Sequence, residues 1–259
     1  MIINNGFIQA VIMGLFFTTF CLIVKNIFIE FYNLGPEAEM AAKDYFFVVS
    51  LGMIFFFVGP MFTQAFTSLG DSFTPFVINA VGLVINMVLD PVLIFGLGPF
   101  PHMGAKGAAL ATILSQFVVV LIYFLVVISK DGIIKSAISY IDYRENWQLE
   151  IFKLGLPAAL LSGFHASISM VLNRFMSAFG PTPVAVCAIG SQLESISWNT
   201  TEGIQVGIQA LVAQNYGAED KKRVKESIKE SFRLVAIIGI IATLVLIIFR
   251  HKFFEIFTP

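Results

Sequence analysis

Charge is the scarcest feature of this sequence. Of its 259 residues only 13% are Asp, Glu, Lys or Arg, whereas 57% are hydrophobic and the mean hydropathy is +0.85. A soluble domain carries roughly twice that charged fraction. The low charge therefore excludes an ordinary soluble protein and leaves little sequence for a separate soluble domain. A net charge of -1 also provides no basic field for binding nucleic acid.

Cysteine is rare, and the common signatures of nucleotide-binding and hydrolytic enzymes are missing. Cys21 and Cys187 both lie in apolar runs, where a small buried hydrophobic residue is the expected role rather than half of a disulfide or a metal ligand. The sequence contains no GxxxxGK[ST], GxSxG or HExxH motif, so an ATPase or a hydrolase would lack its usual chemistry. The sequence therefore predicts neither an enzyme nor a cofactor.

Long apolar runs are what the sequence has instead. A helix needs about 20 apolar residues to cross a bilayer, and seven runs are long enough. They cover residues 8–30, 44–66, 74–97, 107–129, 151–178, 184–213 and 232–257. These runs predict an all-α membrane protein, a polytopic bundle of seven transmembrane helices. The predicted location is the cell (inner or plasma) membrane, which the chain crosses several times.

The longest polar connection, KDGIIKSAISYIDYRENWQLE, lies at residues 130–150 and divides the chain. We expect four helices in residues 1–129, a cytoplasmic linker at 130–150 and three further helices in 151–259. An amphipathic helix on the membrane surface is one arrangement for this linker. The cytoplasmic side is predicted because Lys and Arg are concentrated in this loop, and short basic loops stay inside the cell.

A single charge, Asp90, stands inside the third run, directly before Pro91. Asn79 and Asn86 precede it on the same helical face, and all three side chains fall within roughly 40° of one another. A carboxylate in such a run is costly unless it faces protein, water or an ion. With neutral oxygens beside it, it suits a proton or a hard cation such as Na+, and Thr112 could add a hydroxyl. The alternative is a packing network in which Asp90 bonds to a neighbouring helix.

A second polar stripe lies in the run at 184–213. Its members Glu194, Trp198, Glu202 and Gln205 fall within about 80° of arc. Two acids in one membrane helix are hard to explain by packing alone, and an aromatic ring between them suits an organic cation. In the run at 151–178, His165 lies near the middle and is able to titrate near neutral pH. These five residues are the predicted substrate cavity; alternatively Glu202 is solvated near the surface and His165 is only hydrogen-bonded.

Several motifs resemble those of the multidrug and toxic compound extrusion (MATE) transporters. The matching positions in the first half are Gly70-Asp71, Pro75, Asn86, Asp90-Pro91 and Gly107-Ala108-Ala109-Leu110-Ala111-Thr112. In the second half they are Gly155-Leu156-Pro157 and Ala213-Gln214-Asn215-Tyr216-Gly217-Ala218. The resemblance covers essentially the whole chain. It implies twelve helices in two six-helix lobes, of which this chain would hold helices 3 to 9, so that the missing helices of a parent chain would be its partners.

The resemblance also implies a function and a site. Such a protein is a secondary active antiporter that exports organic cations, drugs or toxic metabolites in exchange for Na+ or H+, by rocking between inward- and outward-facing states. The family's cation site uses an acid on helix 1, an Asn and an Asp on helix 5 and a hydroxyl on helix 6. Asn86, Asp90 and Thr112 match the last three, and the helix 1 acid lies outside this chain. Where some members carry a helix 7 carboxylate, this chain has His165, which cannot be an anionic ligand.

Two other interpretations stay open. A lipid-linked saccharide flippase of the same superfold tends to line its cavity with several basic residues, whereas here Arg174 is the only basic residue well inside a run apart from Lys25 near an end. A seven-helix receptor or membrane-embedded protein would bury its polar stripes against its own helices. The partners predicted for the transporter are the lipid bilayer and a small cationic or amphipathic organic substrate, without nucleic acid.

Overall fold

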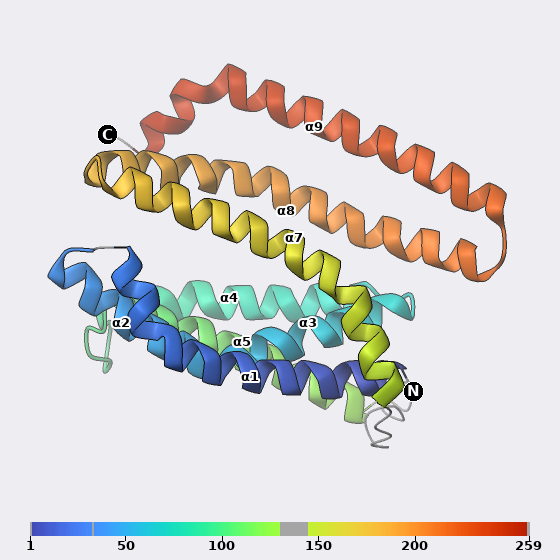
Figure 1. The fold of residues 1–259 in the computed structure, drawn as a ribbon, viewed down its shortest axis with the longest axis horizontal. Coiled ribbons are helices and arrows are strands. Elements are labelled where there is room, and N and C mark those ends of the chain that lie inside the picture. Colours follow the sequence, from blue (N-terminus) through green and yellow to red (C-terminus); the bar gives the residue numbers. More distant parts are fainter. Residues whose placement is uncertain (1, 33, 130–144, 258–259) are drawn as a thin grey trace. The chain divides into compact units, whose positions relative to one another are not determined.

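The computed structural model describes residues 2–32, 34–129 and 145–257, and eight helices form nearly all of them (Figure 1). In chain order these are α1 (Ile2–Phe31), α2 (Pro36–Leu51), α3 (Met53–Ser68), α4 (Phe73–Phe95), α5 (Ala105–Ser129), α7 (Glu145–Ser177), α8 (Pro181–Gly217) and α9 (Lys221–Phe257). No described residue belongs to a β-strand. The predicted all-α class is confirmed.

The seven predicted runs correspond to eight helices because the run at 44–66 is divided. Helices α2 and α3 meet at Gly52 with a bend of 49°, and the pair together is long and apolar enough for one broken span or a re-entrant loop. A Cβ atom on Gly52 would lie 2.5 Å from Cγ1 of Ile113 in α5, so glycine permits the close approach of the bend to α5. Five further helices are long and apolar enough to cross a membrane: α1, α4, α5, α7 and α9. The run at 184–213 forms α8, but its polar stripe keeps its hydropathy below that of these helices.

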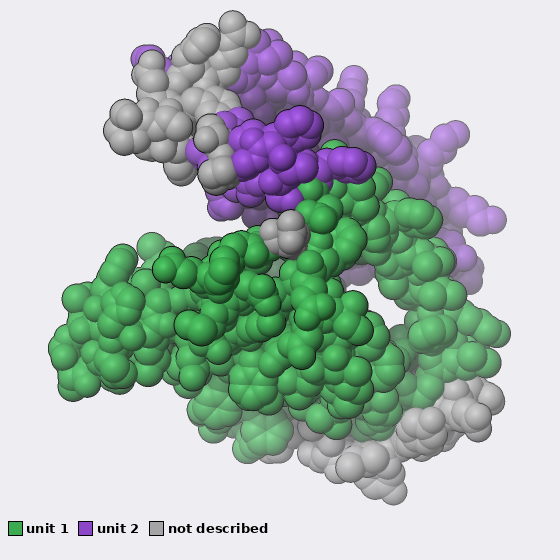
Figure 2. Space-filling model, turned by 60° about the vertical axis from the view of Figure 1, so that its left-hand side comes forward, with its two compact units in different colours: residues 1–174 green, residues 175–259 purple. Residues whose placement is uncertain are grey.

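Contacts divide the chain into two compact units, residues 1–174 (unit 1) and 175–259 (unit 2), coloured separately in Figure 2. In unit 1, α4 packs against α5, α1 against α2 and α3, and α5 also against α2 and α3. The core of unit 1 is apolar and aromatic, centred on Phe62 of α3 and Tyr123 of α5, which are 1% and 0% exposed. In unit 2, α8 packs along α9. Most of the predicted linker at 130–150 lies outside the described residues, and residues 145–150 form the first turns of α7.

Two glycines bring α4 and α5 close together. A Cβ on Gly82 would lie 2.2 Å from Cγ2 of Val119, and one on Gly107 would lie 2.5 Å from the backbone oxygen of Leu93. Since early α4 thus meets late α5, and late α4 meets early α5, the two helices run antiparallel. This register places the second half of α4, with Asn86 and Asp90, level with the first half of α5.

Unit 1 also holds the start of α7. The side-chain amide of Gln148 donates to the backbone oxygen of Asn5 in α1 at 2.9 Å and to its side-chain oxygen at 3.1 Å. Asn5 is fully buried. From residue 152 to 169 the side chains of α7 are exposed. Its first turns are therefore where α7 attaches to the rest of unit 1.

Candidate functional site

The predicted polar stripe lies on α4, which contains Pro91 within its length. The side chains of Asn86 and Asp90 are partly buried, one helical turn apart. Nδ2 of Asn86 and Oδ1 of Asp90 are shielded from solvent and have no hydrogen-bond partner among the described residues. A buried polar atom left unpaired costs about 1–3 kcal/mol, and more when it is charged. The two atoms need partners of different kinds: Oδ1 of Asp90 accepts, and Nδ2 of Asn86 donates.

Thr112 lies on α5 at the level of this pair. Its hydroxyl donates to the backbone oxygen of Ala108, one turn earlier, at 3.0 Å. This bond occupies its proton and leaves an oxygen lone pair for an ion. In the part of the chain that the structure describes, no hydrogen bond joins Thr112 to Asn86 or to Asp90. The structure therefore places Thr112 at the level of the pair and shows no bond to either residue.

Asn79, two turns before Asn86, belongs to a different cluster. Its Nδ2 donates to the hydroxyl oxygens of Tyr123 and Thr63, at 3.3 Å and 3.4 Å, and these two hydroxyls lie 3.0 Å apart. The three residues come from α4, α5 and α3 respectively. Sequence analysis identified Asn79 but missed its partners, because a hydroxyl in an apolar run is a weak signal when the facing helix is unknown.

A polar cavity of about 300 Å³ opens beside this cluster in unit 1. Its lining comes from α3, α4 and α5 and consists of Phe56, Gly59, Pro60, Thr63, Gln64, Asn79 and Gln116. None of these described residues carries a charge. Gln64 and Gln116 were not predicted as site residues. Both are amides inside predicted spans, as Asn79 is, so the sequence carries the same signal for them.

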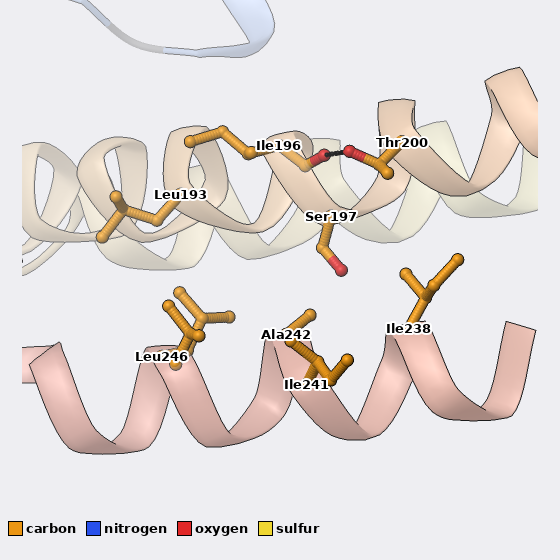
Figure 3. A pocket seen from close by; sticks show the side chains of 9 residues that line it. Leu193, Ile196, Ser197, Thr200, Ile238, Ile241, Ala242 and Leu246 are labelled. Atoms are coloured by element: carbon orange, nitrogen blue, oxygen red, sulfur yellow. Dashed lines mark hydrogen bonds between the residues drawn. The ribbon is translucent and has the colours of Figure 1, made fainter.

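The second predicted site divides between α8 and α7. Glu194, Trp198, Glu202 and Gln205 all lie on one exposed face of α8. The opposite face packs against α9 around a groove of about 250 Å³, almost wholly apolar, and none of these four described residues lines it. Figure 3 shows that groove, with Ser197 turned toward α9 and Thr200 donating to the backbone oxygen of Ile196 at 2.7 Å. His165 lies at an exposed position of α7.

The described residues contain no group of three or more His, Cys, Asp or Glu side chains that is arranged to hold a metal ion. An ion at Asp90 would thus rely on one carboxylate together with amide, hydroxyl or backbone oxygens. Such a neutral-rich ligand set suits a monovalent ion or a proton better than a tightly held divalent metal.

Two family models match different parts of the chain. Residues 157–259 match the model described as MatE, and residues 7–148 match the model described as lipid II flippase MurJ. The two matches do not overlap.

Relatives extend the similarity over nearly the whole chain. The chain is 29% identical over 98% of its length to a probable multidrug resistance protein NorM of Thermotoga maritima. It is 28% identical over 83% of its length to an FAD transporter of Shewanella oneidensis. The chain spans about half the length of these curated relatives, 54% and 47%. Its fold is that of the outward-facing structure of a multidrug resistance MATE family transporter of the MOP superfamily. That structure has a TM-score of 0.82 and 21% identity, with 99% of this chain and 57% of the other covered.

Proposed function

The chain belongs to the MATE family of membrane transporters, and we propose that it acts within a secondary active antiporter that exports organic cations, drugs or toxic metabolites in exchange for Na+ or H+. It is a multi-pass protein of the cell membrane. The observation that carries the proposal is the buried, unpartnered oxygen of Asp90 beside the unpartnered amide of Asn86. In this proposal residues 1–129 and 151–259 belong to two different lobes joined by residues 130–150.

The coupling step follows from the cost of burying charge. A carboxylate in apolar surroundings is stable when a proton or a cation neutralises it, and it needs water when it is bare. Loading and unloading Asp90 would therefore favour different packings of α4 against its neighbours, and a ligand shifts such an equilibrium by its difference in affinity for the two states. Asn86 and Thr112 supply neutral oxygens beside the carboxylate, and Asn79 lies at the cavity end of the same stripe.

The substrate side of the proposal uses the exposed stripe of α8. Glu194 and Glu202 attract a cation, and Trp198 between them offers a ring face for a cation–π contact, worth about 0.5–1 kcal/mol at an exposed site. Gln205 and His165 extend the polar surface. We propose that these residues take part in a substrate cavity of the whole transporter.

The test of this function is the Asp90→Asn variant, which keeps the shape of the side chain and removes its charge. In lipid nanodiscs, the thermal unfolding midpoint of the wild-type chain is expected to rise when Na+ replaces choline or when the pH falls. A bound ligand at about 100 times its Kd adds roughly 2.7 kcal/mol of stability. Asp90→Asn should lose the response, and cells producing it should lose Na+- or proton-dependent efflux while its level in the membrane stays unchanged.

Asp44→Asn is the matched control, because Asp44 is an exposed carboxylate of α2 outside the stripe. It should keep both the ion response and the efflux. If Asp90→Asn retained the full response to both Na+ and pH, Asp90 would not be the coupling residue.

The match of residues 7–148 to the lipid II flippase model favours a second candidate, a lipid-linked saccharide flippase of the same superfold. An anionic head group would call for Arg or Lys in the cavity, whereas the described lining of the unit 1 cavity is neutral. A flippase should move a fluorescent lipid-linked saccharide between the leaflets of vesicles. The antiporter that we propose should leave it in place.

A further inference from the structure

We propose that Tyr123 and Thr63 hold the amide of Asn79 in one orientation, with its carbonyl oxygen toward the unit 1 cavity, and that the cavity thereby selects cations that carry N–H donors. This inference rests on the proposed function, because it specifies which organic cations the transporter accepts. It assigns Tyr123 as a positioning residue, since its hydroxyl acts through Asn79.

The orientation of the amide follows from counting protons. The Thr63 hydroxyl lies 3.3 Å from the backbone oxygen of Gly59, to which it donates. The Tyr123 hydroxyl then donates to the oxygen of Thr63 at 3.0 Å. Both hydroxyl oxygens still accept, and the two protons of the Asn79 amide nitrogen supply them. All four protons of the cluster are used.

The reversed amide fails this count. With the Asn79 oxygen turned toward the hydroxyls, the three residues would have only the two hydroxyl protons to share. Thr63 would donate to Tyr123 and Tyr123 to Asn79, so the bond from Thr63 to Gly59 would be lost and the oxygens of Asn79 and Thr63 would face each other without a proton between them. The cluster therefore favours the orientation in which the amide nitrogen faces the two hydroxyls, and the carbonyl oxygen of Asn79 remains as the group available to a ligand.

Packing holds Tyr123 in place. Its side chain is 0% exposed. Its ring stacks on Phe62 with the centroids 5.3 Å apart and an angle of 8° between the rings, and it also contacts Phe66 at 5.8 Å. A hydroxyl on so constrained a ring keeps its position, so the cluster is organised before any ligand arrives.

The rest of the cavity adds acceptors without adding charge. Pro60 has no N–H, so the carbonyl of Phe56 lacks its usual helical donor, and both residues line the cavity. The amides of Gln64 and Gln116 also line it, but an amide without fixed partners can present either end. Asn79 and the Phe56 carbonyl are therefore the fixed acceptors. A protonated amine can donate to them, whereas a quaternary ammonium ion has the same charge and no N–H.

The test compares two probes of equal charge, 1-naphthylmethylammonium and trimethyl(1-naphthylmethyl)ammonium, by calorimetric titration of the whole chain in lipid nanodiscs. The wild type is expected to prefer the first probe by about tenfold, the typical effect of one charge-assisted hydrogen bond. Tyr123→Phe should reduce that preference about fivefold or more by weakening binding of the primary ammonium only, because the amide of Asn79 is then free to turn. Tyr45→Phe is the control, since Tyr45 is an exposed tyrosine of α2.

Asn79→Leu is the second variant, because Asn79 lies at the cavity surface and its replacement leaves the packed ring of Tyr123 in place. It should reduce the preference at least as far as Tyr123→Phe while the quaternary probe still binds. An unchanged preference in both variants would overturn the role of the cluster and leave cation export standing. If the wild type bound neither probe, the proposed substrate class would fail together with this inference.

Discussion

Asp90 and Asn79 share one polar stripe of α4, yet their surroundings differ. One oxygen of Asp90 is buried without a partner among the described residues, and the same is true of the amide nitrogen of Asn86. The amide nitrogen of Asn79, by contrast, donates both of its protons, one to the hydroxyl of Thr63 and one to the hydroxyl of Tyr123. At the scale of single residues, the stripe thus combines a carboxylate oxygen without a described partner and an amide whose nitrogen is bound; the ion at Asp90 and the ligand at the Asn79 carbonyl are our proposals.

A prediction at this scale concerns Glu194 on the exposed stripe of α8. Replacing it by Gln keeps its shape and removes its charge, so affinity for organic cations should fall more than affinity for neutral compounds. For an exposed charge the expected loss is about two- to fivefold. Titration of the whole chain with 1-naphthylmethylammonium and with neutral 1-naphthalenemethanol measures the difference. Glu226→Gln, in the charged first turns of α9, is the control, and equal losses for both compounds would mean that Glu194 does not act through its charge.

At the scale of helices, small residues decide which faces meet. Gly82 and Gly107 let α4 and α5 approach so closely that no other side chain fits without displacement. Ala111, one turn after Gly107 on the same face of α5, is 0% exposed. Close backbone approach through small residues is the usual basis of helix association in membranes, where apolar burial alone gives little preference. The register that puts Thr112 level with Asp90 therefore depends on these positions.

Gly107→Ala tests this packing. The added methyl group would overlap the backbone of Leu93 at 2.5 Å, so the helices must separate, at a cost of about 1–3 kcal/mol. For a chain of this size that corresponds to a lower Tm by about 2–4 °C per kcal/mol, measured by thermal unfolding in nanodiscs. Gly190→Ala in α8 is the matched control, since no described atom lies within 4 Å of its added carbon. It should leave Tm unchanged or raise it, because Ala favours a helix over Gly. An equal Tm for Gly107→Ala would show that α4 and α5 are not tightly packed there.

At the scale of the whole molecule, the chain consists of two compact units, and α7 leaves the packed helices of unit 1 after its first turns. Bonds from Gln148 to the buried Asn5 are among the polar contacts at that attachment. The family models also match two separate stretches, 7–148 and 157–259.

Gln148→Ala is expected to loosen this attachment. Without the side-chain amide, the two bonds to Asn5 are lost, so the first turns of α7 should exchange their backbone hydrogens faster, by about five- to tenfold for one to two lost hydrogen bonds. Hydrogen exchange with mass spectrometry measures this, and peptides from α8 and α9 serve as an internal reference. Gln209→Ala, at an exposed position of α8, should leave the exchange of α7 unchanged. Protection of residues 145–151 at the wild-type level in Gln148→Ala would contradict the assignment.

The sequence by itself determined the class of protein, the position of nearly every helix and the stripe on α4. Hydropathy and helical periodicity are local properties, so runs of about 20 apolar residues and an isolated Asp90 can be read without knowing any neighbour. The division of the second run at Gly52 was missed, because glycine within a run is compatible with a straight helix until α5 packs against it. The roles predicted for Asp90, Asn86, Thr112 and the stripe of α8 stay predictions for the experiments above.

The tertiary structure alone decided which side chains meet. Thr63, Asn79 and Tyr123 are separated by 16 and 44 positions in the sequence, and nothing local to any one of them indicates the other two. Their contact depends on the register of three helices, which close packing at Gly52, Gly82 and Gly107 sets. Hydropathy identifies a polar atom that needs a partner, but only the packed bundle determines whether that partner is another side chain, as for Asn79, or is left to a ligand, as for Asp90.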